Sequence, residues 1–298
     1  MAGKLQSVRL DVTSSVASSA QRLPPESYFV ASAIFHYLGP AFAVLLFAHV
    51  EPLGVAWLRI ASAAAVFAAW CRPWRLFRQL DAADRRRLML LGVVLAAMNS
   101  TFYLALEELP LATVGAIEFL GPIGLAAFSA RRARNVLALV FAVTGVYLLT
   151  DVRIGGAPLA YVFAFANCLL FVLYIVIGHR IAADGGARGI QRLGAAMLIA
   201  ASVALPVGLA DAAPALLDPL LLAAGIGVGI CSSVVPYICD QLAMARISRA
   251  SFALMLALLP ATATIVGILL LEQIPTLPEL AGIGLVIVGV AVHRRREV

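Results

Sequence analysis

Apolar segments follow one another almost without interruption along this 298-residue chain, and they constrain its fold more than any other feature. A membrane-spanning helix needs about 20 predominantly apolar residues. Ten segments of about that length occur, at 28–48, 52–71, 88–106, 110–129, 135–150, 157–178, 191–210, 219–244, 250–271 and 277–293. Hydrophobic residues make up 62% of the chain and charged residues only 13%. A soluble or a disordered protein contains more polar and charged residues than this. The sequence therefore predicts a protein that lies in a lipid bilayer.

The segments lack the alternation of apolar and polar residues that is typical of membrane β-barrels. A helix satisfies its backbone hydrogen bonds within one segment, as the hydrocarbon interior requires. We therefore expect an all-α polytopic membrane protein with ten transmembrane helices. The connections between the segments are too short to hold an inserted soluble domain.

The net charge of +6 would suggest a nucleic-acid partner if the protein were soluble. The positions of the basic residues favour another explanation. With ten spans, all of the 22 Lys and Arg residues except Arg59 and Arg153 fall at the ends of spans on one side. Because such residues normally stay in cytoplasmic loops, both termini are predicted to be cytoplasmic, with lipid and not nucleic acid as the partner.

Residues 1–27 contain a Ser/Ala-rich stretch and two adjacent prolines, but not the apolar core of a signal peptide. They are predicted to form a cytoplasmic tail. The four cysteines and four histidines show no metal-binding spacing, so no metal or other cofactor is expected. The chain also lacks the GxxxxGK[ST] loop of ATPases and the GxSxG and HExxH motifs of hydrolases. These absences argue against an enzyme and favour a gradient as the energy source.

An internal repeat relates the two halves of the chain. Residues 103–129 align with residues 241–267 without a gap, which places Pro122 on Pro260. Because each half holds five predicted helices, an odd number, the second half enters the membrane from the opposite side. Such inverted repeats place a substrate site between the halves and work by alternating access. The expected halves are residues 28–152 and 153–298.

Three stretches carry a more specific resemblance: NSTFYLALEELPLATVGAIEFLGPIGLAAFSARR from Asn99, RPWRL from Arg72 and VVPYICDQLAMARIS from Val234. With its two five-helix halves, the chain resembles the EamA-type drug/metabolite transporter superfamily and is most similar to the threonine/homoserine exporters. The resemblance covers nearly all of the chain after residue 28. It implies amino-acid export across the bacterial inner membrane in exchange for protons. The chain departs from the family pattern at Leu259, where an acidic residue usually precedes the proline.

Three polar residues fall at one depth within the apolar segments. Arg59, Asn99 and Glu118 each lie about 10 to 12 Å below the outer boundary, at 1.5 Å per residue. A charge in hydrocarbon costs at least about 2.5 to 3.5 kcal/mol, so we expect Arg59 and Glu118 to pair, with Asn99 completing the hydrogen bonding. The cluster can receive the carboxylate and ammonium of an amino acid, or Glu118 can carry the coupling proton. The alternative is an ion pair that only fixes helix packing.

Five further polar residues are candidates for the same substrate or proton site. Tyr103 and Tyr237 can line a cavity, or they can be interfacial anchors. His36 and Asn167, one in the first helix of each half, can line a cavity or bond a neighbouring helix. Asp240 lies close to the inner boundary, where hydration lowers the cost of its charge, and is a candidate gate residue.

These features together predict a secondary transporter that exports small metabolites with proton coupling, and the expected substrates are neutral amino acids such as threonine or homoserine. The alternatives are an exporter of purine-like or amphipathic compounds and a passive facilitator. The inverted repeat favours a carrier over a channel. Surfaces for subunit pairing and for lipid are both apolar, so the sequence does not define an oligomeric state.

Overall fold

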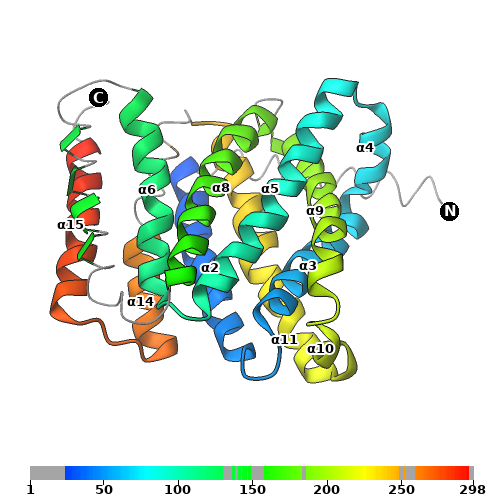
Figure 1. Cartoon of the computed structure of the whole chain (residues 1–298). Coiled ribbons are helices and arrows are strands. Elements are labelled where there is room, and N and C mark those ends of the chain that lie inside the picture. Colours follow the sequence, from blue (N-terminus) through cyan, green and yellow to red (C-terminus); the bar gives the residue numbers. More distant parts are fainter. Residues whose placement is uncertain are drawn as a thin grey trace.

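Every regular element in the described part of the chain is a helix, as Figure 1 shows. The computed structural model describes residues 24–129, 158–182, 186–247 and 259–294, together with residue 252 and scattered positions between 136 and 148. The helices are α2 (Pro25–Leu46), α3 (Pro52–Cys71), α4 (Pro73–Gln79), α5 (Ala82–Leu106), α6 (Leu111–Ser129), α8 (Pro158–Ala182), α9 (Gly186–Gly208), α10 (Ala213–Leu217), α11 (Pro219–Gly229), the π-helix η1 (Ile230–Val234), α12 (Val235–Met244), α14 (Leu259–Leu271) and α15 (Leu277–Arg294). The predicted all-α class is confirmed. Nearly half of the predicted segment 135–150, most of residues 250–258 at the start of segment 250–271 and nearly all of the tail lie outside the described residues.

Within the described residues, five helical stretches are long and apolar enough to cross a bilayer: Pro52–Cys71, Ala82–Leu106, Pro158–Ala182, Arg188–Gly208 and Pro219–Met244. Shorter apolar stretches occur in α2, α6, α14 and α15. The surface of α8 illustrates the environment of these helices. Its residues Leu159, Val162 and Leu169 are each at least 60% exposed, whereas Asn167 and Phe171 on another face are buried. A row of large exposed apolar side chains along one helix face is suited to lipid contact.

Helix boundaries follow local sequence signals. Proline occupies the first position of α2, α3, α4 and α11, where its missing N–H is not needed. Asp81 caps α5 by accepting a hydrogen bond from the Asp84 amide, and Asp218 caps α11 in the same way. Between α3 and α4, Arg72 adopts a left-handed conformation with φ 48°, which turns the chain sharply before Pro73.

The two ends of the helix bundle differ in charge. We call one the arginine end, since it carries α4, the starts of α5 and α9, and the C-terminal ends of α8, α12 and α15 (top of Figure 1). Its described arginines are Arg72, Arg75, Arg78, Arg85, Arg86, Arg87, Arg180, Arg188, Arg192, Arg246 and Arg294. The opposite end, the acidic end, carries Glu51, Glu107, Glu108, Asp211, Asp218 and Glu272. The separation of charge agrees with the prediction made from the sequence.

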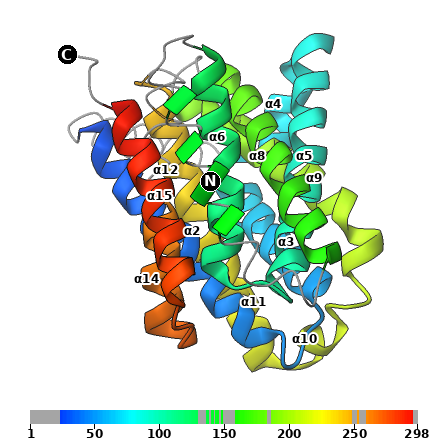
Figure 2. The same cartoon turned by 60° about the vertical axis from the view of Figure 1, so that its left-hand side comes forward.

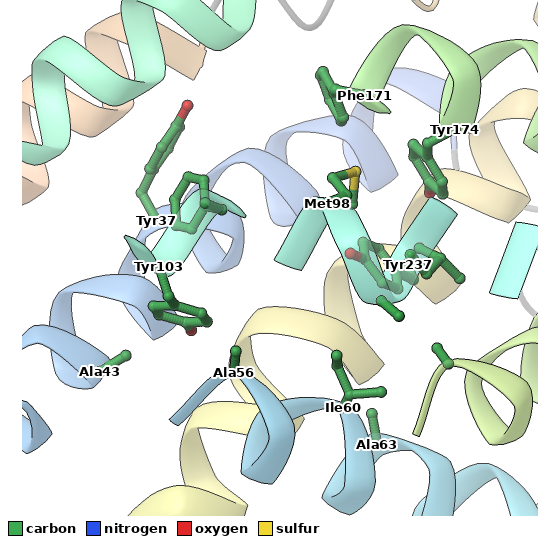
Figure 3. Packing of buried hydrophobic residues seen from close by; sticks show 14 of the residues in the cluster. Tyr37, Ala43, Ala56, Ile60, Ala63, Met98, Tyr103, Phe171, Tyr174 and Tyr237 are labelled. Atoms are coloured by element: carbon green, nitrogen blue, oxygen red, sulfur yellow. The ribbon is translucent and has the colours of Figure 1, made fainter. Parts of the chain in front are cut away.

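Helices that are distant in sequence form the centre of the bundle. α2 packs against η1, α12 and α14, while α8 packs against α5 and α6, and α3 packs against α9. Figure 2 shows α14 and α15 beside α2 and α6 at one side of the molecule. The core between these helices is rich in tyrosine, and Figure 3 shows Tyr37, Tyr103, Tyr174 and Tyr237 among its buried side chains. Polar groups are therefore brought into the middle of an apolar bundle.

Candidate functional site

Arg59, in the interior of α3, is 4% exposed and is held by neutral partners. Its Nε donates a hydrogen bond to the Ser233 hydroxyl at 2.8 Å, and its terminal amino group donates to the Ser232 carbonyl at 2.8 Å. The guanidinium carbon also lies 5.6 Å from the centre of the Tyr103 ring, within the range of a cation–π interaction. These contacts offset part of the cost of burying the charge.

A proline explains why the Ser232 carbonyl is available to Arg59. In an α-helix, the N–H of residue 236 would donate to the carbonyl of residue 232. Pro236 has no N–H, so it cannot donate to that carbonyl, and the preceding turn is the π-helix η1. The irregular backbone of one helix therefore supplies an acceptor for the charge on another.

Glu118, in α6, is 3% exposed and has a separate set of partners. Its Oε1 accepts a hydrogen bond from the Asn167 side chain at 2.9 Å, and its Oε2 accepts one from the Tyr37 hydroxyl at 3.3 Å. The His36 Nε2 atom lies 3.8 Å from Oε2, close enough for an ion pair when the imidazole is protonated. Residues from α2 and α8 thus meet at one carboxylate of α6.

The predicted ion pair between Arg59 and Glu118, both of which the structure describes, is not formed. The prediction was wrong because depth along the helices does not reveal which faces meet. Each charge instead finds polar partners on its own side of the cavity. The predicted role of Asn99 in this pair was also wrong, since its amide nitrogen donates to the Leu95 carbonyl of the same helix at 2.6 Å.

Arg59 and Glu118 nevertheless line one small cavity in the centre of the bundle. Its lining residues are His36, Arg59, Met98, Asn99, Phe102, Glu118, Asn167 and Tyr237. The cavity measures about 10 Å³, enough for about one water molecule. The side-chain oxygens of Asn99, Asn167 and Tyr237 have no hydrogen-bond partner among the described residues. Opposite charges and free polar atoms therefore surround a closed space that is much smaller than an amino acid.

A larger cavity of about 600 Å³, which we call the vestibule, lies at the acidic end. It is lined by Val44, Phe47, Leu106, Glu107, Glu108, Leu109, Pro110, Ala112, Thr113, Thr264, Gly267, Glu272, Gln273, Ile274, Pro275, Glu279 and Ile283. Partial desolvation raises the pKa of Glu107, and the nearby charges of Glu108 and Glu51 raise it further. The volume lies within the range of small-molecule binding pockets.

Tyr37 packs where α2, α6 and α14 come close together. Tyr37 is fully buried, and its hydroxyl reaches Glu118 past Gly115, where a Cβ atom would lie 2.7 Å from that hydroxyl. The same position would lie 3.1 Å from the Cβ atom of Ala263 in α14. Gly115 therefore permits a close approach of α2, α6 and α14, and Tyr37 closes the space between them.

Asp240 belongs to a different cluster, nearer the arginine end. It accepts hydrogen bonds from the Ser32 hydroxyl at 2.6 Å and from the Tyr174 hydroxyl at 3.3 Å. With 2% exposure it is buried, so the predicted hydration of its carboxylate was wrong. Packing of α12 against α2 and α8 covers it, although it lies only one helical turn from the end of α12.

The structure brings together six of the eight predicted site residues, the lining residues His36, Arg59, Asn99, Glu118, Asn167 and Tyr237. Tyr103 lies beside Arg59, and Asp240 stands apart. The prediction did not include the partners Ser32, Tyr37, Tyr174, Ser232 and Ser233. Pro236 signalled a free carbonyl at Ser232, but no sequence signal marked Tyr37 among the many aromatic residues.

Fold and site together define a polytopic α-helical membrane protein with opposite charges enclosed in its interior. Secondary transporters are built in this way.

Comparisons with known proteins agree with this class. Residues 158–294 match the EamA-like transporter family. The threonine/homoserine exporter RhtA of Escherichia coli (strain K12) is 32% identical over 256 residues, which cover 84% of each chain. RhtA of Salmonella typhimurium (strain LT2) is 31% identical over 242 residues, which cover 79% of each chain. The chain belongs to the EamA-like transporter family, and it is a transporter and not an enzyme.

A solved crystal structure shares the fold. It superimposes with a TM-score of 0.61 at 21% sequence identity, over 90% of this chain and 97% of the other.

Proposed function

We propose that the protein is a secondary transporter that exports neutral amino acids such as threonine and homoserine, by alternating access and in exchange for protons. The observation that carries this proposal is the placement of Arg59 and Glu118 on one closed cavity without a bond between them. A zwitterion carries both opposite charges, so its carboxylate can bind Arg59 and its ammonium can bind Glu118. The relatives named as threonine/homoserine exporters support the same substrate class.

Alternating access also requires two structurally related halves. In the proposed arrangement, ten helices form two inverted halves, residues 28–152 and 153–298. The contacts between the two halves support this arrangement. α2, the first helix of one half, packs against α12 and α14, the third and fourth helical segments of the other half, and α8 packs against α5 and α6 in the corresponding way. The central cavity then lies between the halves.

The closed cavity corresponds to an occluded state in this scheme. Substrate would enter from the arginine end, which we place in the cytoplasm of a bacterium, and leave through the vestibule at the acidic end. Opening toward the vestibule would require Tyr37 to leave its position between α6 and α14. Protonation of Glu118 would weaken both its hydrogen bond with the Tyr37 hydroxyl and its attraction for the substrate ammonium.

Counterflow in proteoliposomes tests the function. We expect liposomes that contain the full-length protein and unlabelled threonine to accumulate labelled threonine transiently. Glu118→Gln should reduce this counterflow about tenfold or more, because it removes a charge that contacts the substrate. Glu51→Gln is the matched control, since Glu51 is exposed in the turn between α2 and α3 and should leave counterflow unchanged.

Two results would contradict the proposal. Wild-type counterflow in a folded Glu118→Gln protein would show that the carboxylate does not contact substrate. Threonine flux without any counterflow would indicate a passive facilitator. A parallel series with homoserine and a purine base would test the range of substrates.

A further inference from the structure

A second buried carboxylate lies outside the central cavity. Asp240 is 2% exposed, and among the described residues its hydrogen-bond donors are the neutral side chains of Ser32 and Tyr174. A carboxylate that is removed from water without a cation is costly, and binding a proton removes that cost. Asp240 lies four residues before the end of α12, or about 6 Å from the arginine end. It is therefore placed between that end and the centre of the membrane.

The surroundings of the two buried carboxylates are similar. Glu118 accepts hydrogen bonds from a tyrosine hydroxyl, that of Tyr37, and from the neutral amide of Asn167. Asp240 accepts hydrogen bonds from a tyrosine hydroxyl and from the neutral hydroxyl of a serine. In both cases the donors come from α2 and α8. Each carboxylate can thus bind or release a proton without breaking an ion pair to a permanently charged side chain.

One face of α2 connects the two clusters. Ser32 and His36 are one helical turn apart and share that face. Ser32 bonds Asp240, and the His36 Nε2 atom lies 3.8 Å from the Glu118 carboxylate. His36 is therefore close to the Glu118 carboxylate and lies one helical turn from the serine that bonds Asp240.

Aromatic and polar side chains from several helices surround His36. Phe171 of α8 contacts the imidazole with ring centres 6.1 Å apart, and Tyr37 of α2 lies at 5.3 Å. The titratable, charged and polar groups that share the central cavity with His36 are Arg59 of α3, Asn99 of α5, Glu118 of α6, Asn167 of α8 and Tyr237 of α12. Arg59 is directed to η1 by its hydrogen bonds to Ser232 and Ser233. Among the described residues Glu118 is thus the acidic group within ion-pair distance of His36, and Ser32 on the same face of α2 leads to Asp240.

We infer that Asp240 is a second proton-binding carboxylate and that His36 passes a proton between Glu118 and Asp240. The inference rests on the proposed proton exchange. In the first step the O–H bond of protonated Glu118 breaks and an N–H bond forms on the imidazole. In the second step the imidazole turns along the face of α2 toward Ser32, an imidazolium N–H bond breaks and an O–H bond forms on Asp240. One proton moves from the central cavity toward the arginine end, and an imidazole suits this role because it gains and loses protons near neutral pH.

Two transport assays on the full-length protein in liposomes separate this relay from substrate binding. Counterflow of threonine at equal pH needs no net proton movement, whereas uphill transport under an imposed pH gradient needs the relay. Asp240→Asn should keep counterflow and lose gradient-driven transport by about tenfold or more, and His36→Gln should lose gradient-driven transport to the same extent. Cys239→Ser, next to Asp240 on α12, is the matched control and should retain both activities. Gradient-driven transport at wild-type rates in Asp240→Asn and His36→Gln would overturn the relay. A wild-type protein that shows no threonine counterflow would instead overturn the proposed function.

Infrared difference spectra of the purified full-length protein on pH change give a test that needs no substrate. Wild type should show two buried carboxyl bands, of which Glu118→Gln removes one and Asp240→Asn removes the other. His36→Gln should shift the pH at which both bands titrate. If His36→Gln leaves both titrations unchanged, or if Asp240→Asn removes no band, the relay is refuted. The infrared test decides on the relay even if threonine is not the substrate.

Discussion

At the residue scale, the central feature is that Arg59 and Glu118 lie on one cavity with separate partners. Arg59 is bound by the backbone and hydroxyl groups of η1, and Glu118 by a tyrosine and an asparagine. A direct ion pair would be strongest in a dry interior and would compete with substrate for both charges. Neutral partners stabilise each charge while leaving it able to bind a zwitterion. The site is in this sense preorganised for a ligand with two opposite charges.

Gly115→Ala tests the residue that gives Tyr37 access to Glu118. The added Cβ would lie 2.7 Å from the Tyr37 hydroxyl, so the hydroxyl must move and its bond to Glu118 should break. Overpacking of this kind costs about 1 to 3 kcal/mol. We expect a lower thermal unfolding midpoint and slower threonine counterflow.

Gly124→Ala is the matched control on the same helix. No atom of the described residues lies within 4 Å of a Cβ atom at Gly124, so alanine should leave stability and transport unchanged or slightly improve stability. Equal unfolding midpoints and equal counterflow in the two variants would disprove the proposed contact of Tyr37 with Gly115.

At the element scale, three prolines in the apolar helices stand beside functional positions. Pro40 and Pro122 stand four residues after His36 and Glu118, as Pro236 stands four residues after Ser232. An internal proline removes the donor to the carbonyl four residues before it. Backbone carbonyls that lack this donor thus lie beside the central cavity and the Arg59 contacts.

Pro236→Ala tests this use of irregular backbone. Alanine restores an N–H that can bond the Ser232 carbonyl and draws the helix toward regular α geometry, in competition with Arg59. We expect threonine counterflow to fall about tenfold, while the unfolding midpoint is maintained or raised.

Pro206→Ala provides the comparison in α9, where the exposed proline stands four residues after the exposed Ser202. It should change transport little. If Pro236→Ala transports threonine as fast as Pro206→Ala, the carbonyl of Ser232 is not required for positioning Arg59.

At the scale of the whole molecule, charge separates the two ends of the bundle and the vestibule opens at only one of them. The arginine end carries α4, in which Trp74 is about half exposed beside basic residues, a combination typical of a membrane interface. The acidic end carries the vestibule and exposed leucines such as Leu217 and Leu220. This polarity predicts the orientation of the protein in the membrane.

Single-cysteine labelling in intact cells tests that orientation. The background would have Cys71, Cys168, Cys231 and Cys239 replaced by alanine. We expect Glu108→Cys to react with a membrane-impermeant maleimide from outside, and Arg75→Cys to react only after the cells are permeabilised. The reverse pattern would show that the vestibule faces the cytoplasm and would exclude it as the route of exit.

Much of the architecture could be predicted from hydrophobicity and charge. α3 and α5 coincide closely with predicted segments because proline, aspartate and apolar length are local properties of the chain. The candidate residues Arg59 and Glu118 could be found because charges in an apolar segment are few and costly. Their partners could not be found, since a contact between α3 and η1 depends on how distant helices rotate and pack. Tyr37 is the clearest example, because nothing distinguishes it from other aromatic residues until α6 lies against α2.

The helical fold, the membrane location and the set of buried polar residues follow from local hydrophobicity and charge, because bilayer energetics act on each segment separately. Tertiary packing was needed to show that Arg59 binds η1, that Glu118 binds Tyr37 and Asn167, and that Asp240 joins α2 to α8. Those contacts depend on side-chain direction at helix interfaces, where lipid and protein are equally apolar and only close packing distinguishes one partner from another.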